Sequence, residues 1–280
     1  MSSIRDWLLR VWRGGTPRPA EDRSPPTTLG PGRVAGAPPS GNGASSFHLF
    51  WDLPGTFSAV RATIEVVQPP TANRLYFWAL QADFTDESGQ SHGGAHLGPQ
   101  FHPDYPGRTA VNWGGYESDG RILRGSTSPL RGSLGNPHTR DFPWKPGRTY
   151  RLAIELADDQ TDAMPGTTAW EGSIADLSTG NRVVIRQLYP RGNRLVRPMV
   201  WAEVFARCDD PTVEVHWSDF EAVEFSTSEI VRANTVTLNY QSHNDGGCAN
   251  TDSSPLPDSG IRQRTNVLRT QPQGSRINFS

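Results

Sequence analysis

The sequence predicts an all-β fold, an antiparallel β-sandwich, and three observations support this. The chain of 280 residues has 28 Gly, 24 Pro and 9 Trp, while hydrophobic residues make up 35%. This balance is typical of short strands joined by turns. Segments of alternating polarity recur along the chain, with Gly, Pro, Asn and Asp clusters between them. Beyond the N-terminal region, almost no segment has the periodicity of a helix.

The N-terminal region differs from the rest of the chain. Between residues 16 and 46, Pro, Gly, Ser and Ala dominate, so this segment cannot bury enough apolar surface to offset the entropy of ordering it. Residues 1–46 are therefore predicted to form a flexible, disordered tail. Apolar residues at helical spacing occur near its start: Ile4, Trp7, Leu8 and Val11. A short amphipathic, basic helix over 4–13 is predicted, either docking on a membrane surface or partner or forming a frayed end.

The folded domain is predicted to span residues 47–280 as a single sandwich, a size that all-β domains reach. Its first strand is expected in FHLFWDL, which begins at Phe47. The further strands are expected at 58–67, 73–84, 94–101, 109–115, 148–157, 167–177, 181–189, 196–205, 211–224 and 234–240. The segment after Tyr240 is expected to pack back onto the sandwich.

Side chains alternate across a pleated strand, so polarity assigns faces. In the strand at 148–157 the residues predicted to face the core are Tyr150, Leu152, Ile154 and Leu156. In the strand at 196–205 they are Val200, Ala202 and Val204. The opposite face of this second strand then carries Met199, Trp201, Glu203 and Phe205. A face with such side chains is either covered by a loop or used for binding.

Charge and cysteine usage limit the partners and the compartment. The formal charge of −2 gives no general attraction to nucleic acid, and no apolar run reaches the roughly 18 residues of a membrane span. Cys208 and Cys248 are expected to form a disulfide, with two free thiols as the alternative. The fold class and these cysteines favour an extracellular location, but the first residues show no standard signal peptide, so the location stays open.

The order of segments resembles a concanavalin A-like, laminin-G-type jelly roll, as found in many bacterial extracellular domains of unknown function. The stretches that carry the resemblance are YFWALQADF, GGAHLGPQFHP, VNWGGY, AWEGSIADLSTG, VWAEVF and VHWSDFE. The resemblance covers residues 47–240 and implies saccharide binding on the concave sheet, with some members acting as glycoside hydrolases or polysaccharide lyases. The E-x-D-x-x-E strand of the retaining glucanases is absent from this sequence.

A carbohydrate-binding role is the function that the sequence favours, because aromatic rings stack on sugars while amides, imidazoles and carboxylates bond their hydroxyls. The predicted ligand-binding residues are His96, Gln100, His102, Asn112, Trp113, Tyr116, Trp201 and Glu203. The partner is expected to be an oligo- or polysaccharide. For Trp113 the competing prediction is a place in the core, the usual position of Trp in a sandwich.

Three alternatives remain open at the level of sequence. A glycoside hydrolase needs paired carboxylates, which Glu155 and Glu203 supply if their strands are neighbours. A polysaccharide lyase needs a Tyr or His base and a group that neutralises a uronate, and Gln81, His96, Gln100, His102, Asn112 and Tyr116 have the right types. A structural or partner-binding sandwich needs neither. His92, His96, His102 and Asp104 have no established metal-ligand spacing, so no metal and no cofactor are predicted, and a binding protein is favoured over an enzyme.

Overall fold

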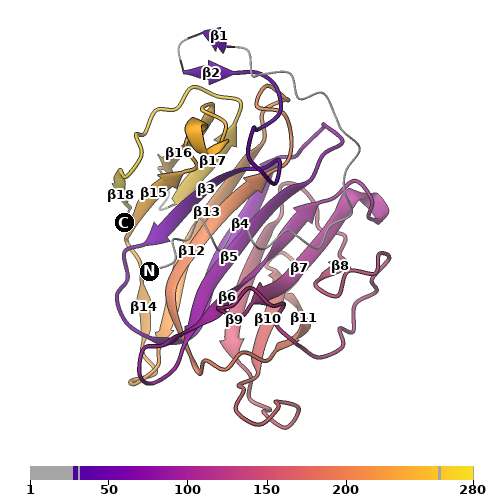
Figure 1. Cartoon of the computed structure of the whole chain (residues 1–280), viewed down its shortest axis with the longest axis vertical. Coiled ribbons are helices and arrows are strands. Elements are labelled where there is room, and N and C mark those ends of the chain that lie inside the picture. The colour runs from indigo at the N-terminus through magenta and orange to yellow at the C-terminus, as the bar shows by residue number, and fades with distance from the viewer. Residues whose placement is uncertain (1–27, 31, 258–259, 280) are drawn as a thin grey trace.

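The computed structural model describes residues 28–30, 32–257 and 260–279, and it shows an antiparallel β-sandwich (Figure 1). The strands are β1 (Thr28–Gly30), β2 (Arg33–Val34), β3 (Ser45–Trp51), β4 (Phe57–Gln68), β5 (Tyr76–Thr85), β6 (Ser91–Phe101), β7 (Thr109–Tyr116), β8 (Thr139–Asp141), β9 (Thr149–Leu156), β10 (Trp170–Asp176), β11 (Asn181–Leu188), β12 (Arg194–Val204), β13 (Glu214–Glu224), β14 (Ile230–Arg232), β15 (Thr235–Tyr240), β16 (Thr251–Leu256), β17 (Gly260–Thr265) and β18 (Arg276–Asn278). The described helical elements are short 3-10 turns, η1 (Pro106–Arg108) and η2 (His243–Asp245). The predicted all-β class is confirmed, while the helix expected over 4–13 lies outside the described residues.

The strands form two layers, both antiparallel. Layer A has the order β16-β17-β13-β4-β9-β10-β11, with β14 beside β13. Layer B has the order β18-β15-β3-β12-β5-β6-β7-β8. Leu195 of β12 pairs with Phe57 of β4, which joins the layers where these two central strands begin. Strands β1 and β2 pair separately and stand at one end of the molecule in Figure 1.

The hydrophobic core lies between the layers and is built largely of aromatic rings. Phe84 of layer B contacts Trp170 of layer A with ring centroids 5.6 Å apart. Trp113 of layer B packs on Gly172 of layer A, where a Cβ atom would stand 2.6 Å from the indole ring. Glycine is therefore required at position 172 because the indole occupies the space of a side chain.

The predicted faces can be compared with the observed burial. Tyr150, Leu152 and Ile154 are buried, as predicted for β9, but Leu156 is 37% exposed because β9 ends there. The predicted core residues of β12, Val200, Ala202 and Val204, are buried between the layers.

The outer face of layer A is charged, which is typical of a sheet face that meets water. Arg61 and Glu155 form an ion pair on adjacent strands, and Arg182 pairs with both Glu155 and Glu171. Glu155 therefore belongs to layer A and does not meet Glu203 of layer B, contrary to the carboxylate pairing that a glycoside hydrolase would need.

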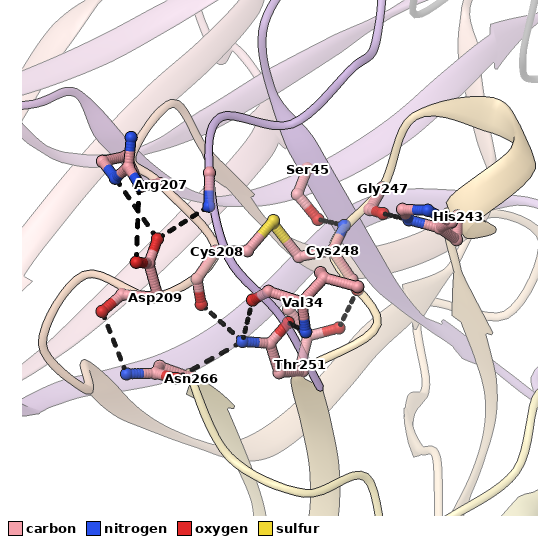
Figure 2. Close-up of a disulfide and its surroundings, with 12 residues drawn as sticks. Val34, Ser45, Arg207, Cys208, Asp209, His243, Gly247, Cys248, Thr251 and Asn266 are labelled. Carbon is pink, nitrogen blue, oxygen red and sulfur yellow. Dashed lines mark hydrogen bonds and ion pairs between the residues drawn. A yellow bond between two sulfur atoms is a disulfide. The ribbon is translucent and has the colours of Figure 1, made fainter. Parts of the chain in front are cut away.

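The packed domain starts earlier than the predicted boundary at residue 47. Val34 N–H donates to Asn250 Oδ1, and Gly36 N–H donates to Asp209 Oδ1 at 2.9 Å. These contacts are polar, so a composition poor in large apolar residues did not indicate them. Figure 2 shows that this segment lies beside the disulfide between Cys208 and Cys248, where Cys208 N–H donates to the Gly36 carbonyl.

The predicted disulfide is present, with Cα atoms 5.4 Å apart. It joins the loop after β12 to the loop before β16, and Asn250 next to it donates to the carbonyls of Cys208 and Val34. The segment after Tyr240 returns to the sandwich, where β16 and β17 extend layer A and β18 extends layer B.

Candidate functional site

One row of side chains crosses the outer face of layer B, the face turned away from the core. Glu203 of β12 pairs with Phe77 of β5, and Phe77 pairs with Gln100 of β6. Paired residues on adjacent strands point to the same face, so the three side chains lie side by side with Phe77 in the middle. With strands about 4.8 Å apart, the Cα atoms of Glu203 and Gln100 are about 10 Å apart.

A second row of polar groups lies further along the same strands. Gln81 of β5 pairs with Met199 on one side and with His96 on the other. The Trp201 indole Nε1–H donates to Gln81 Oε1 at 2.8 Å. His96 pairs with Gly114 of β7, and the His138 ring lies where a side chain at Gly114 would stand.

Aromatic rings surround the carboxylate-bearing row. The centroids of Trp201 and Phe77 are 4.9 Å apart, and those of Phe77 and His96 are 5.5 Å apart, both edge to face. Trp201 also contacts His48 of β3 at 6.3 Å. Edge-to-face packing at these distances is favourable and holds the rings in one arrangement.

The Glu203 carboxylate is fixed from a distant part of the sequence. Asn42 Nδ2 donates to Glu203 Oε1 at 3.2 Å. Asn42 Oδ1 in turn accepts hydrogen bonds from Ser40 Oγ and the Ala44 N–H, which orient the amide. The segment that precedes β3 therefore supplies a hydrogen-bond donor to this face.

Burial keeps the neighbouring titratable groups neutral. It lowers the pKa of His48 to about 4 and that of His96 to about 3, so both imidazoles are uncharged at neutral pH. Burial, and next the charge of Glu203, raise the pKa of Tyr116 to about 12. The buried Glu203 side chain thus shares this face with two neutral imidazoles and a neutral phenol.

Several buried polar atoms on this face have no hydrogen-bond partner among the described residues. They are Gln100 Oε1, Asn112 Oδ1 and both ring nitrogens of His48. Buried polar atoms are nearly always paired in folded proteins, so these exceptions indicate a place where a ligand or water completes the bonding. Asn112 is held through its other atom, because Nδ2 donates to Thr139 Oγ1 at 2.9 Å.

The structure brings together most of the residues predicted from sequence. His96, Gln100, Asn112, Tyr116, Trp201 and Glu203 share the outer face of layer B. Trp113 is in the core instead, with no exposed surface, because it points to the opposite face of β7 from Asn112. His102 lies in the turn after β6, with its ring against Tyr105.

Residues that the sequence reasoning did not include also reach this face. Phe77 and His48 could have been found by extending the alternation of β12 to its neighbours, but that requires the strand order. Asn42 carries no periodic signal, since it precedes the first long strand. The histidines weighed as a metal site diverge: His92 bonds Asp86 at 2.9 Å while His96 faces Trp201. The described residues contain no cluster of three or more metal-ligating side chains.

The chain resembles a few solved structures at low sequence identity. No family model and no curated protein match the chain. Among solved structures, scytalidoglutamic peptidase with a peptide-based transition-state analogue is 11% identical, covering 78% of this chain and 97% of that one, at a TM-score of 0.45. SCP-B of the eqolisin family of peptidases, solved with the tripeptide Ala-Ile-His, is also 11% identical. This match covers 84% of this chain and 100% of that one, at a TM-score of 0.42. A native glycosidic hydrolase is 8% identical, and the match covers 63% of this chain and 79% of that one, at a TM-score of 0.23. These values are too low to assign chemistry.

The carbohydrate-binding prediction is wrong. The similar solved structures named first are peptidases. The expected open trough is also missing, because Trp201, Gln100 and Glu203 are each only 2% exposed. Alternation correctly placed these side chains opposite the core, but it does not tell whether the second face meets water. None of the described helices is long and apolar enough to cross a membrane.

Proposed function

We propose that this protein is a hydrolase that cleaves peptide bonds on the outer face of layer B. The observation that carries the proposal is the row in which Glu203 and Gln100 flank Phe77. A carboxyl group and a carboxamide thus lie on the two strands that flank β5, in register with the Phe77 ring between them. The peptidases named above resemble the chain too weakly to serve as support.

The reaction assigns one role to each group. The Glu203 carboxylate accepts a proton from a water molecule, whose oxygen bonds to the carbonyl carbon of the substrate. The Gln100 Nε2–H donates to the carbonyl oxygen as negative charge develops on it. Glu203 then gives its proton to the leaving nitrogen as the carbon–nitrogen bond breaks. Each step moves a proton or an electron pair between named atoms and needs no further reactant.

Hydrolysis of a glycosidic bond fits the face less well. That reaction uses two carboxyl groups about 5 to 10 Å apart. Among the described residues of this face, Asp83 lies six positions from Phe77 along β5, about 20 Å away. Asp141 pairs with Ala110 in the same row as Glu203, but four strand spacings separate them, about 19 Å. The described part of this face therefore offers Glu203 no second carboxyl group at the spacing that this reaction uses.

A polysaccharide lyase is disfavoured by charge. Its uronate substrate is anionic, and the Glu203 carboxylate on this face repels an anion. The same carboxylate and burial raise the pKa of Tyr116 to about 12, which makes its phenol a poor source of the phenolate that would act as base.

The test is cleavage of an internally quenched peptide library between about pH 3 and about pH 8, where carboxyl groups and histidines titrate. We expect Glu203→Gln to abolish cleavage and Gln100→Ala to lower kcat on the order of 10² to 10³-fold, as for loss of one oxyanion donor.

The matched control is Glu155→Gln, which removes a carboxylate of layer A that is engaged with Arg61. It should leave the rate unchanged. A Glu203→Gln variant that cleaves as fast as the wild type contradicts the proposal. So does a wild-type chain that cleaves no peptide of the library.

A further inference from the structure

A short segment joins β7 of layer B to β11 of layer A on one side of the sandwich. Leu123 N–H donates to the Gly115 carbonyl of β7 at 2.9 Å. Tyr189 N–H, directly after β11, donates to the Arg124 carbonyl at 2.9 Å. Residues 123–125 therefore bridge the two layers. We call this junction, made of β7, residues 123–125 and β11, the seam.

The Arg186 side chain of β11 is buried in the seam, with 5% of its surface exposed. Arg186 pairs with Gly172 of β10, and the Trp113 indole occupies the space of a side chain at Gly172. Paired residues point to the same face, so the Arg186 side chain leaves β11 on the core side, next to this indole. Its Cζ atom lies 3.3 Å from the position that a Cβ atom of Gly125 would take. The guanidinium is therefore enclosed between β11 and the bridging residues.

No carboxylate of the described chain forms an ion pair with this guanidinium. Its hydrogen-bond partner is an imidazole, since Arg186 Nη2 donates to His138 Nδ1 at 2.9 Å. Burial lowers the pKa of His138 to about 4, so the imidazole is neutral. Burial, and next the positive charge of Arg140, lower the pKa of Arg186 to about 10, which leaves it charged at neutral pH. The nearby Tyr189 phenol adds no negative charge, because burial raises its pKa.

The buried polar atoms around this charge that have no partner among the described residues are all donors. They are Arg186 Nε, Trp113 Nε1 and His138 Nε2. Guanidinium and indole N–H groups only donate. The neutral His138 ring accepts at Nδ1, so its proton is on Nε2. Buried charges in proteins are paired and buried donors are bonded, so this surplus of donors and positive charge requires a negatively charged acceptor.

We propose that the seam binds one monatomic anion of the halide class, such as chloride, on the Nε–H of Arg186, with the Trp113 indole N–H as the neighbouring donor. Arg186, Trp113 and His138 are 5%, 0% and 8% exposed, and burial of this degree selects the smallest anions over sulfate or a peptide carboxylate. The bound anion neutralises Arg186 and thereby stabilises the contact between β11 and residues 123–125. This inference does not rest on peptide cleavage.

Bromide, which replaces chloride and scatters X-rays anomalously, tests the site directly in the wild-type chain. The full chain is crystallised in sodium bromide, and the anomalous difference map is calculated at the bromine absorption edge. We expect a peak at hydrogen-bond distance from Arg186 Nε. An ordered water only at this position overturns the proposal, and so do bromide peaks confined to exposed arginines, which are adventitious ions only.

Thermal unfolding measures the contribution of the anion to stability. Chloride is exchanged for gluconate at constant ionic strength, so that general screening by salt does not change. Above the Kd, each tenfold rise in chloride should raise the Tm of the wild type by roughly 3 to 6 °C. Arg186→Met should lose this dependence. The matched control is Arg182→Met, which removes an arginine of the same strand that is paired with Glu155 and Glu171, and it should keep the dependence.

Two further comparisons separate anion binding from a structural role of Arg186. Without chloride, Arg186→Met should unfold at the same Tm as the wild type or higher, because a buried charge without a counter-charge has been removed. Trp113→Phe keeps the charge and loses one donor, so the same rise in Tm should need at least about tenfold more chloride. A wild-type Tm that does not respond to chloride overturns the proposal, even if Arg186→Met does not fold.

Discussion

The side chain of Asn42 donates a hydrogen bond to the Glu203 carboxylate at 3.2 Å across a sequence separation of 161 residues. The contact joins the segment before β3 to the middle of layer B. The segment before β3 is itself anchored, because the Gly36 carbonyl accepts a hydrogen bond from Cys208 N–H. The candidate site is thus assembled from the first part of the described chain as well as from strands β5, β6, β7 and β12.

Replacement of Asn42 by Asp is expected to move the acid limb of the pH–rate profile for peptide cleavage to higher pH. Two adjacent carboxyl groups resist simultaneous ionisation, which raises the pKa at which the second loses its proton. We expect a shift of about one pH unit in the profile of kcat/KM for peptide cleavage. Asn181→Asp, at the exposed start of β11, is the control and should not shift it. An unchanged pH–rate profile for Asn42→Asp would show that the side chain at position 42 does not influence the group that titrates during cleavage.

Acidification is expected to destabilise the fold through the buried histidines. Burial lowers the pKa of His48 to about 4 and of His96 to about 3 in the folded chain, whereas the unfolded chain titrates near 6.5. The two neutral histidines leave the free energy of unfolding at its full value above about pH 6.5. This free energy falls as pH drops towards 4, because the unfolded state then binds more protons than the folded state. At about pH 4.5 each histidine should lower the free energy of unfolding by roughly 2 to 3 kcal/mol relative to neutral pH.

Urea unfolding at neutral and acid pH measures this effect, and the double variant His48→Gln, His96→Gln isolates it. Asp83 acts in the opposite direction, since burial raises its pKa to about 6 and its neutral form is favoured in the folded state as pH falls. The double variant should therefore lose less stability than the wild type on acidification, while His243→Gln, in the exposed turn η2, should behave as the wild type does. If the wild type, the double variant and His243→Gln lose the same stability on acidification, this prediction is wrong.

Removal of the disulfide is expected to lower the free energy of unfolding by about 2 to 4 kcal/mol. Cys208 and Cys248 are 40 residues apart, so the bond constrains a long loop in the unfolded chain. The measurement is urea unfolding of the double variant Cys208→Ser, Cys248→Ser with and without reductant. Reductant should destabilise the wild type and leave the variant unaffected. A variant as stable as the oxidised wild type would show that the bond contributes little.

Gly98 is expected to tolerate no side chain. A Cβ atom there would stand 1.8 Å from the Trp78 carbonyl oxygen on the adjacent strand, so Gly98→Ala must push β5 and β6 apart. We expect a loss above about 3 kcal/mol by urea unfolding, or no folded protein. Gly135→Ala is the matched control, because nothing lies within 4 Å of its added Cβ, and it should change stability by less than about 0.5 kcal/mol. Comparable values for the two variants would argue against this packing.

Some strands could be predicted from the sequence and others could not, for a physical reason. The alternation in β9 correctly placed Tyr150, Leu152 and Ile154 in the core. Strands β16 and β17 were missed, since TDSSPL and GIRQRT are polar. Their burial depends on hydrogen bonds instead of apolar contact: Gln263 accepts from the Trp217 indole, and Asp252 accepts from the N–H of Thr270.

The sequence by itself determined the all-β class, the paired cysteines, and which residues of one strand share a face, because side-chain alternation is a local property of the pleated backbone. Thus Trp201 and Glu203 were correctly placed opposite Val200 and Ala202. Only the tertiary structure decided which strands are neighbours, and hence that Glu203 lies beside Phe77 and Gln100 and not near Glu155. It also decided that the second face of layer B is buried. Pairing order and burial depend on contacts between residues far apart in the chain, which periodicity does not encode.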